Sequence, residues 1–169
     1  MNRTRCVAFL CLAIGALANC AFAQTSASSQ SLVGTWTLIS VDNVFPDGSR
    51  MHLYGEQPHG ILMFDAKGRY ALQILSANRP RFVLNDKSKG TAEEYKAAMQ
   101  GSNSHFGRYT VQQDTAITFH IEYASFPNWE GTEQKRLFTL TGNELKYTVP
   151  TPTTGGAQAT GEVIWKRAH

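Results

Sequence analysis

The sequence has few cysteines and none beyond residue 23. Its three cysteines are Cys6, Cys11 and Cys20, so residues 24–169 contain no thiol. That part of the chain therefore forms no disulfide and has neither a cysteine nucleophile nor a cysteine ligand for a metal. Its length of about 146 residues is still sufficient to bury a hydrophobic core without cross-links.

Neither sign of charge dominates. Sixteen Lys and Arg residues against 13 Asp and Glu residues give a formal net charge of +3. Two of the cations, Arg3 and Arg5, lie in a segment that we expect to be removed, which leaves +1. A nearly neutral protein offers no electrostatic surface for nucleic acid or for anionic membranes, so we expect neither partner.

Long apolar runs are also missing. The longest apolar stretch, Cys6–Ala18, has 13 residues, and a helix of that length reaches about 20 Å, short of the roughly 30 Å hydrocarbon core of a bilayer. We therefore expect no stable membrane insertion. The basic start of the chain and the small residues of Ala21–Ala23 instead predict a Sec-type signal peptide over residues 1–23, cut before Gln24, with a periplasmic or secreted product. A lipoprotein modified at Cys20 is the alternative, but Asn19 stands where such signals need a small residue.

Common catalytic and cofactor motifs are absent. The sequence contains no H-E-x-x-H, no phosphate-binding loop, no G-x-G-x-x-G and no G-x-S-x-G. The histidines at 52, 59, 105 and 120 lack the paired spacing of metal ligands, and His169 ends the chain. We expect neither a metal nor a cofactor.

What the sequence does contain is a series of short alternating segments separated by turns. They cover residues 34–44, 49–54, 60–65, 69–75, 105–113, 116–124, 134–141, 144–149 and 160–167. One helix is predicted over residues 91–100, because Thr91–Glu94 has the form of a capping box and Gly101 follows the segment. Strands joined mostly by hairpins form an antiparallel sheet, and a sheet this long tends to close, because closure removes its exposed edges. We predict an all-β fold, a closed antiparallel up-and-down barrel of about eight or nine strands over residues 32–167, with residues 24–31 as a flexible tail.

The turns fix the register of the strands, and the register decides which side chains face inward. Across Gly142–Asn143, Phe138 faces Tyr147. The loop at Asp114 allows two registers, and the one that keeps the apolar residues together sets Tyr109 beside Phe119. This register also turns His105, Ile121 and Tyr123 inward, and it leaves His120 and Glu122 outside.

Arg136 is predicted to lie on the inner face, where an unpaired guanidinium costs several kcal/mol. In one interpretation it binds the carboxylate of an amphipathic ligand whose apolar body contacts the other inner side chains. In the other, which is the more usual fate of a buried charge, Arg136 pairs with a strand-end carboxylate or packs on Trp36. The predicted ligand-binding residues are Trp36, Phe64, Tyr70, Leu72, His105, Tyr109, Phe119, Arg136, Phe138, Leu140 and Tyr147.

Three further features are candidates for function. The turn at Pro46–Gly48 places Asp42 opposite His52, in phase with Trp36, and an imidazole oriented by a carboxylate is the minimum for a general base. Such strand-end pairs are more often surface hydrogen bonds, so the catalytic candidates Asp42, His52 and His105 stand beside that structural alternative. Residues 78–101 form a long excursion that we expect to be a lid over one barrel end, with a solvated insertion as the alternative. The rim and lid candidates are Tyr95, Met99, Phe126 and Trp129.

Several stretches resemble the lipocalin-like domain family of bacteria and fungi. Gly34-Thr35-Trp36 has the G-x-W form that opens the first strand of lipocalin barrels. In these barrels a basic residue of the last strand packs on that tryptophan, and Val163–Arg167 looks like this strand. Further resemblance is carried by residues 60–65, 105–111 and 125–136, so that it extends over roughly Leu32–Arg167. The chain departs from the standard lipocalin plan, because its helix is mid-chain and the usual disulfides are absent.

The resemblance implies a barrel that holds a small, mostly apolar molecule. We therefore expect an exported protein that binds a small hydrophobic or amphipathic ligand in its lumen. One alternative is a barrel-lumen enzyme, a cyclase, isomerase or hydrolase of a small hydrophobic substrate. The other is a structural barrel whose large inner side chains fill the core.

Overall fold

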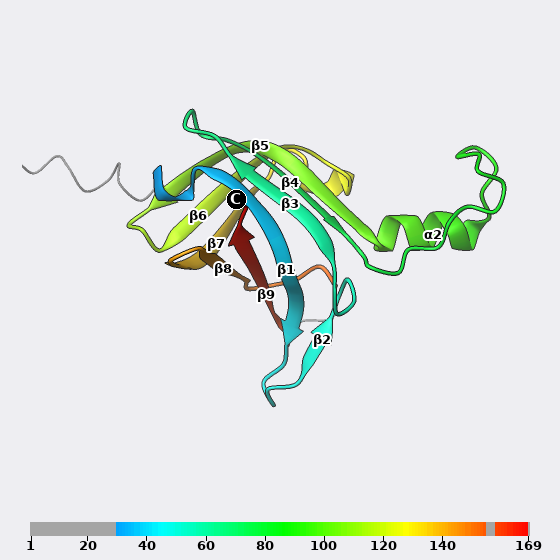
Figure 1. Cartoon of the computed structure of the whole chain (residues 1–169), viewed down its shortest axis with the longest axis horizontal. Helices are drawn as coiled ribbons and strands as arrows, with labels where there is room; N and C mark the ends of the chain where they lie inside the picture. Colours follow the sequence, from blue (N-terminus) through cyan, green and yellow to red (C-terminus); the bar gives the residue numbers. More distant parts are fainter. Residues whose placement is uncertain (1–29, 155–157, 169) are drawn as a thin grey trace, which may run out of the picture.

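Nine strands, the helix α2 and one 3₁₀ turn follow residues 30–32, which are helical, in the computed structural model, which describes residues 30–154 and 158–168 (Figure 1). Their bounds are β1 (Gly34–Val44), β2 (Arg50–His52), β3 (His59–Phe64), β4 (Arg69–Leu75), α2 (Ala92–Gln100), β5 (Ser102–Gln112), β6 (Ala116–Ala124), η1 (Pro127–Trp129), β7 (Glu133–Thr141), β8 (Glu144–Val149) and β9 (Thr160–Arg167). Most predicted segments agree with these bounds to within one residue. β2 is shorter than predicted, and β5 begins earlier.

Eight of the strands close into an antiparallel barrel, as the sequence predicts. β1 pairs with β3 along one edge and with β9 along the other, and this second pairing closes the sheet. β2 is an additional short strand, which pairs only with the end of β1. Closure leaves the long strands without free edges, so the inner face of the sheet becomes the interior of the barrel.

One end of the barrel is packed around Trp36. The ring of Trp36 is fully buried, and its Nε1 donates a hydrogen bond to the carbonyl of Leu32 at 2.9 Å. The guanidinium of Arg167 lies over this ring, 4.2 Å from its centroid, and donates to the carbonyls of Val33 and Ser31. This is the basic residue on the first-strand tryptophan that the resemblance implies. These contacts fill the end of the barrel at which β1 begins.

The registers predicted from tight turns are confirmed. Phe138 pairs with Tyr147, and Tyr109 pairs with Phe119, as expected from the loops between these strands. The outer positions of His120 and Glu122 are also as predicted, and their side chains bind Glu133 and Arg69, respectively.

Two β-bulges, which the sequence did not reveal, lie in β1 and β6. Beyond each bulge, the side chains that were predicted to face inward face outward, and the reverse. At the first bulge Ile39 is the extra residue, because Leu38 pairs with Trp165 and Ser40 with Ile164. Asp42 consequently faces outward, which corrects the expectation that it is in phase with Trp36.

At the second bulge Glu122 is the extra residue, because Phe106 pairs with Tyr123 and Gly107 with Ile121. Tyr123 is therefore 59% exposed and stacks on Phe106 on the outside, instead of pointing inward as predicted. Gly107 is required here: a Cβ at this position would lie 2.1 Å from the carbonyl oxygen of His120.

The connection between β4 and β5, residues 76–101, extends away from the barrel as an arm that carries α2 (Figure 1). Thr91 caps α2, and the capping box with Glu94 is formed as predicted. None of the residues of α2 is buried. The arm is held mainly by its own contacts, among them a hydrogen bond from the hydroxyl of Tyr95 to the carbonyl of Lys87 at 2.8 Å. In the described part of the chain, no helix is long and apolar enough to cross a membrane.

Candidate functional site

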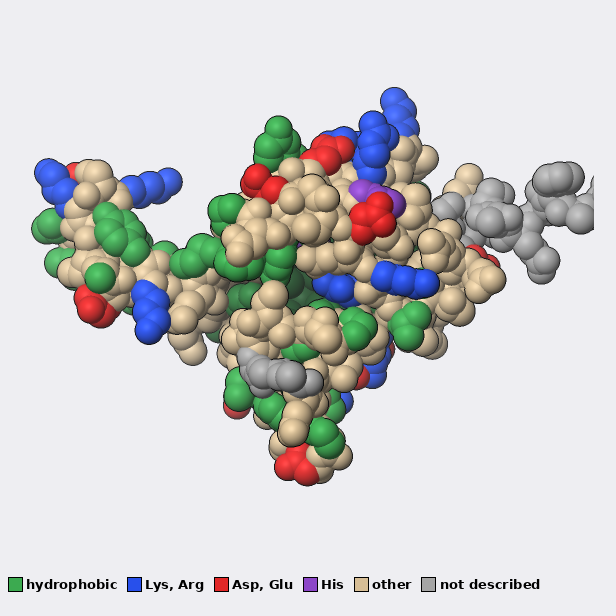
Figure 2. Space-filling model, turned by 180° about the vertical axis from the view of Figure 1, so that it is seen from behind, with side chains coloured by type: hydrophobic (Ala, Val, Ile, Leu, Met, Phe, Trp, Pro, Cys, Tyr) green, Lys and Arg blue, Asp and Glu red, His purple; other side chains and the backbone are tan. Residues whose placement is uncertain are grey.

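A cavity of about 390 Å³ occupies the end of the barrel remote from Trp36. It lies between the second half of β1, the start of β5, the start of β7 and the end of β8, and the segment Pro150–Thr154 forms part of its mouth. Figure 2 shows a hollow in the middle of this face, with apolar side chains around it and Lys or Arg side chains beside it. The inner side chains therefore do not fill the whole barrel, which argues against a purely structural core.

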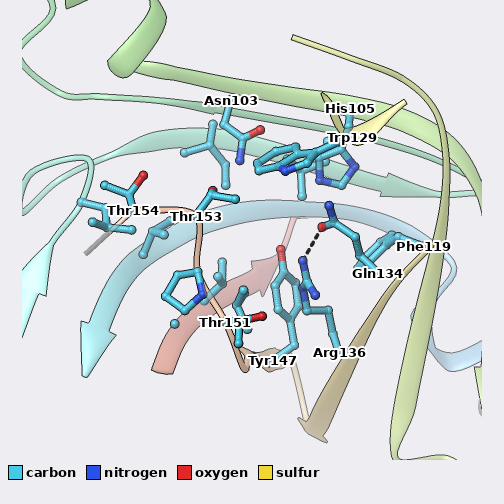
Figure 3. Close-up of a pocket in the computed structure, with 18 of the residues that line it drawn as sticks. Asn103, His105, Phe119, Trp129, Gln134, Arg136, Tyr147, Thr151, Thr153 and Thr154 are labelled. Atoms are coloured by element: carbon cyan, nitrogen blue, oxygen red, sulfur yellow. Dashed lines mark hydrogen bonds between the residues drawn. The ribbon is translucent and has the colours of Figure 1, made fainter. Parts of the chain in front are cut away.

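Arg136 reaches this cavity from β7. Its side chain lies on the same face of the strand as that of Gln134, whose Oε1 accepts a hydrogen bond from Nη2 of Arg136 (Figure 3). Nη1 donates to the carbonyl of Lys135 at 3.0 Å. Among the described residues, no carboxylate lies within ion-pair distance of the guanidinium. Of the three environments predicted for Arg136, the structure thus excludes a carboxylate partner within the described chain.

Burial lowers the pKa of Arg136, but the nearby phenols of Tyr147 and Tyr70 oppose this change. A guanidinium titrates far above neutral pH, so Arg136 keeps its positive charge in the cavity. Tyr147 lies beside it, and burial raises the pKa of the Tyr147 phenol to about 12. The phenol therefore stays neutral and offers a hydrogen-bond donor next to the charge.

His105 is the second predicted polar residue that lines the cavity. Its ring meets that of Trp129 edge-on, with the ring centroids 6.0 Å apart (Figure 3). Its Nδ1 is 2.7 Å from the hydroxyl of Tyr70. Burial, together with the positive charge of Arg136, lowers the pKa of His105 to about 4. At neutral pH the imidazole is uncharged, so Arg136 supplies the positive charge of the inner wall.

The other predicted ligand-binding residues divide into two groups. Leu72 and Phe119 line the cavity together with Arg136, His105 and Tyr147. The rest lie in the packed core beyond it: Trp36, Phe64, Tyr70, Tyr109, Phe138 and Leu140. Tyr70 does not line the cavity, but its hydroxyl bonds to His105, which does. Contact of any of these residues with a ligand stays a prediction.

The rim and lid candidates also fall into two groups, one at the cavity mouth and one on the arm. Trp129 lines the cavity mouth, and Phe126 packs edge-on against it with ring centroids 5.5 Å apart. Tyr95 and Met99 lie on the arm, exposed and outside the cavity. In this structure the arm therefore does not cover the barrel end, which corrects the expected position of the lid.

The lining is more polar than the sequence predicts. Asn43 of β1 and Asn103 of β5 contribute amide groups, and Tyr54 contributes a phenol. Thr151, Thr153 and Thr154, shown at one side of the cavity in Figure 3, belong to a segment that lies between two predicted strands. The bulge at Ile39 turns Asn43 inward, and Asn103 precedes the predicted start of its strand. No signal in the sequence marks either of them.

The pair of Asp42 and His52 forms, but it lies outside the cavity. Nδ1 of His52 donates to the carboxylate of Asp42 at 2.7 Å. Arg50 bridges the carboxylates of Asp42 and Glu162, at 3.1 and 2.8 Å, and Lys146 binds Glu162 as well. Neither Asp42 nor His52 lines the cavity, so the geometry favours the structural alternative for this pair. Among the described residues, no group of three His, Cys, Asp or Glu side chains is placed to hold a metal ion.

Comparison with known proteins defines the class. The sequence model of the lipocalin-like domain matches residues 33–168, and the chain belongs to this family. The 4'-hydroxy-3'-methoxypropiophenone carrier protein of Aspergillus oryzae is 27% identical over an alignment of 103 residues, which covers 56% of this chain and 93% of that protein.

Two solved structures are similar in outline. A lipocalin-like protein from Bacteroides uniformis is 14% identical, with 81% of this chain and 98% of that chain covered and a TM-score of 0.43. The structure of EF1p2_mFAP2b bound to DFHBI is 16% identical, with 86% and 100% covered and a TM-score of 0.42.

Proposed function

We propose that this protein is a carrier that binds one small amphipathic molecule in the barrel cavity, with an aromatic or apolar body and an anionic group. The observation that carries the proposal is Arg136, a positive charge that faces the cavity without a carboxylate partner among the described residues. A guanidinium holds two oxygens of a carboxylate in fixed geometry, and Tyr147 adds a neutral donor beside it. Phe119, Leu72 and Trp129 offer the apolar contacts for the rest of the ligand.

The name of the Aspergillus relative supports a small ligand with an aromatic body. By that name the relative carries a small aromatic ketone. A cavity of about 390 Å³ lies within the range of roughly 300–1,000 Å³ typical of small-molecule sites. Binding followed by release, rather than turnover, is the function that this cavity supports best, because within residues 30–154 and 158–168 no carboxylate contacts the imidazole of His105.

The proposal is tested with a matched pair of ligands, cinnamate and cinnamyl alcohol, which differ in the carboxylate. Titration calorimetry should show that Arg136→Met weakens cinnamate binding by about tenfold or more, as expected for a charge-assisted hydrogen bond. Binding of the alcohol should change by less than about twofold. Arg108→Met, on the exposed outer face, is the control and should leave both affinities unchanged. Equal losses for the two ligands in Arg136→Met, or no binding of either to the wild type, would contradict the proposal.

Export remains part of this proposal. Residues 1–29 lie outside the described residues, and the support is the basic, apolar and small-residue pattern of residues 1–23. Expression of the full chain in a Gram-negative host, followed by intact mass measurement of the periplasmic and culture fractions, should give a chain that starts at Gln24. Recovery of the uncut chain in the cytoplasm alone would overturn it.

A further inference from the structure

The imidazole of His105 presents one hydrogen-bond donor to the cavity. Burial raises the pKa of the Tyr70 phenol, so its hydroxyl donates to Nδ1 of His105 at 2.7 Å and the proton of the neutral ring is on Nε2. Nε2 has no hydrogen-bond partner among the described residues. It is also not one of the unpaired polar atoms that the described residues enclose completely, which are Oδ1 of Asn43, Oδ1 of Asn103 and Nε1 of Trp165. Nε2–H is therefore an unpaired donor that is open to the cavity.

Gln134 presents a second donor beside it. Oε1 of Gln134 accepts the hydrogen bond from Nη2 of Arg136, and this bond decides which end of the amide is the nitrogen. Figure 3 draws the amide between His105 and the guanidinium of Arg136. Phe119 keeps these groups together, because it pairs with Gln134 in the sheet and its ring centroid lies 5.8 Å from that of His105. His105 and Gln134 thus offer two neutral donors next to the positive charge.

The groups around Arg136 are therefore mainly donors. Its guanidinium gives one N–H to Gln134 and one to the carbonyl of Lys135, and three of its five N–H groups remain. Tyr147 adds a protonated hydroxyl. A carboxylate bound at Arg136 does not by itself pair the donor of His105. A ligand that displaces water from this donor without an acceptor of its own loses affinity.

We propose that the ligand is an aromatic 2-oxo acid, whose carboxylate binds at Arg136 and whose oxo oxygen accepts hydrogen bonds from Nε2 of His105 and from the amide nitrogen of Gln134. In such an acid the second acceptor stands on the carbon next to the carboxylate, so that neighbouring donors receive neighbouring oxygens. This inference rests on the proposed function, because it uses the same cavity and the same charge, and it names the chemical class of the acid. An acid with a methylene group at that carbon leaves Nε2–H unpaired and binds more weakly.

The test compares two acids of nearly equal shape, benzoylformate and phenylacetate, which differ only in an oxo group or a methylene group beside the carboxylate. Calorimetric titration of the wild type at neutral pH, where both acids are ionised, should show that benzoylformate binds at least about tenfold more tightly. This comparison needs no variant, so it does not depend on the folding of a mutant. Equal affinities for the two acids would overturn the proposal, and so would a failure of benzoylformate to bind where cinnamate binds.

Variants assign the effect to His105. His105→Met removes the donor, and the preference for benzoylformate should fall to less than about threefold, while the affinity for phenylacetate changes little. His105→Gln supplies an amide donor and should recover a preference of at least about fivefold. His59→Met, at an exposed position of β3 outside the cavity, is the matched control and should keep the wild-type preference.

The outcomes separate this inference from the proposed function. A tenfold preference that survives in His105→Met would place the oxo oxygen elsewhere and overturn the assignment. If the wild type binds neither these acids nor cinnamate, the proposed function itself fails. If cinnamate binds and benzoylformate has no advantage over phenylacetate, only the 2-oxo acid class fails.

Discussion

The hydroxyl of Tyr70 lies 2.7 Å from Nδ1 of His105, and both side chains are buried in the barrel. Burial raises the pKa of the Tyr70 phenol, so this hydroxyl keeps its proton and donates a hydrogen bond to Nδ1 of His105. The imidazole consequently carries its own proton on Nε2. Tyr70 thus holds His105 in one neutral tautomer.

The stability of the barrel should therefore fall in acid. The pKa of His105 is lowered from 6.5 to about 4, so the unfolded chain takes up this proton before the folded protein does. The contribution of the neutral His105 to the free energy of unfolding is present in full above pH 6.5 and is lost as the pH falls toward 4. The loss between pH 8 and pH 5 is about 2 kcal/mol. Urea unfolding at the two pH values measures this loss.

His105→Gln, which keeps an acceptor for Tyr70, should lose about 2 kcal/mol less between these pH values than the wild type, whereas exposed His59→Gln should match the wild type. Parallel acid losses in all three proteins would show that His105 does not titrate in this way.

Removal of His52 should leave ligand binding intact. Its imidazole bonds to Asp42 on the outer face, away from the cavity. We expect His52→Gln to bind cinnamate within about twofold of the wild type by calorimetry, because a group that does not touch the ligand affects affinity only weakly. A tenfold loss, with Arg108→Met unchanged, would return His52 to the candidate site.

Arg50 should matter for stability. It bridges two carboxylates, Asp42 and Glu162, whose side chains are only 6% and 11% exposed. Arg50→Met leaves these buried charges with fewer partners, and we expect it to lower the free energy of unfolding by clearly more than Arg108→Met does. Arg108→Met is the comparison: it removes a looser contact of 3.8 Å to a more exposed Glu122 and should cost less than about 0.5 kcal/mol. Urea unfolding at neutral pH measures the free energy of unfolding of both variants. Equal losses would contradict the expectation that the more buried carboxylates depend more on their cation.

Gly107 should not tolerate a side chain. A Cβ there meets the carbonyl oxygen of His120 at 2.1 Å, a backbone atom that moves only with its strand. We expect Gly107→Ala to lower the free energy of unfolding by about 3 kcal/mol. Gly131→Ala is the control, since Gly131 has a φ of +71° but open space around it, and it should cost about 1 kcal/mol from backbone strain alone. Similar melting temperatures for these two variants would mean that the bulge relaxes easily.

The arm should be dispensable for the barrel. Replacement of residues 78–100 by a short Asn-Gly turn keeps the pairing of Leu75 with Ser102 and removes a helix that buries no residue. The free energy of unfolding should change by less than about 1 kcal/mol, because shortening a loop alters the entropy of closure only slightly. Stopped-flow measurement of cinnamate dissociation should give an unchanged rate. Faster release without the arm would show that it closes over the cavity in solution.

The sequence predicts the barrel well because its hairpins are tight. The loops at Ala66–Gly68 and Gly142–Asn143 admit few geometries, so the pairings of Phe64 with Tyr70 and of Phe138 with Tyr147 follow from counting. The prediction that Arg136 and His105 face the interior depends on such local registers, and the structure places both side chains at the cavity.

The polar part of the cavity lining was not predictable in the same way. Alternation along β1 assigns Trp36 and Asp42 to one face, and the single extra residue at Ile39 exchanges Asp42 for Asn43. Nothing in the side chains of Leu38–Ser40 marks a bulge, since its position is set by pairing with β9, a strand more than a hundred residues away in the sequence. Polar lining from Asn43 and Thr154 thus depends on contacts that local patterns do not contain.

The stack of Arg167 on Trp36 seals one end of the barrel. A molecule held in the cavity must therefore depart by the route through which it came, past Trp129 and the threonines of residues 151–154. A second ligand cannot enter from the closed end of the barrel, so it binds only after the first ligand has dissociated. For the carrier proposed above, the rate of delivery to an acceptor is then set by the dissociation of the ligand, whatever the concentration of competing molecules.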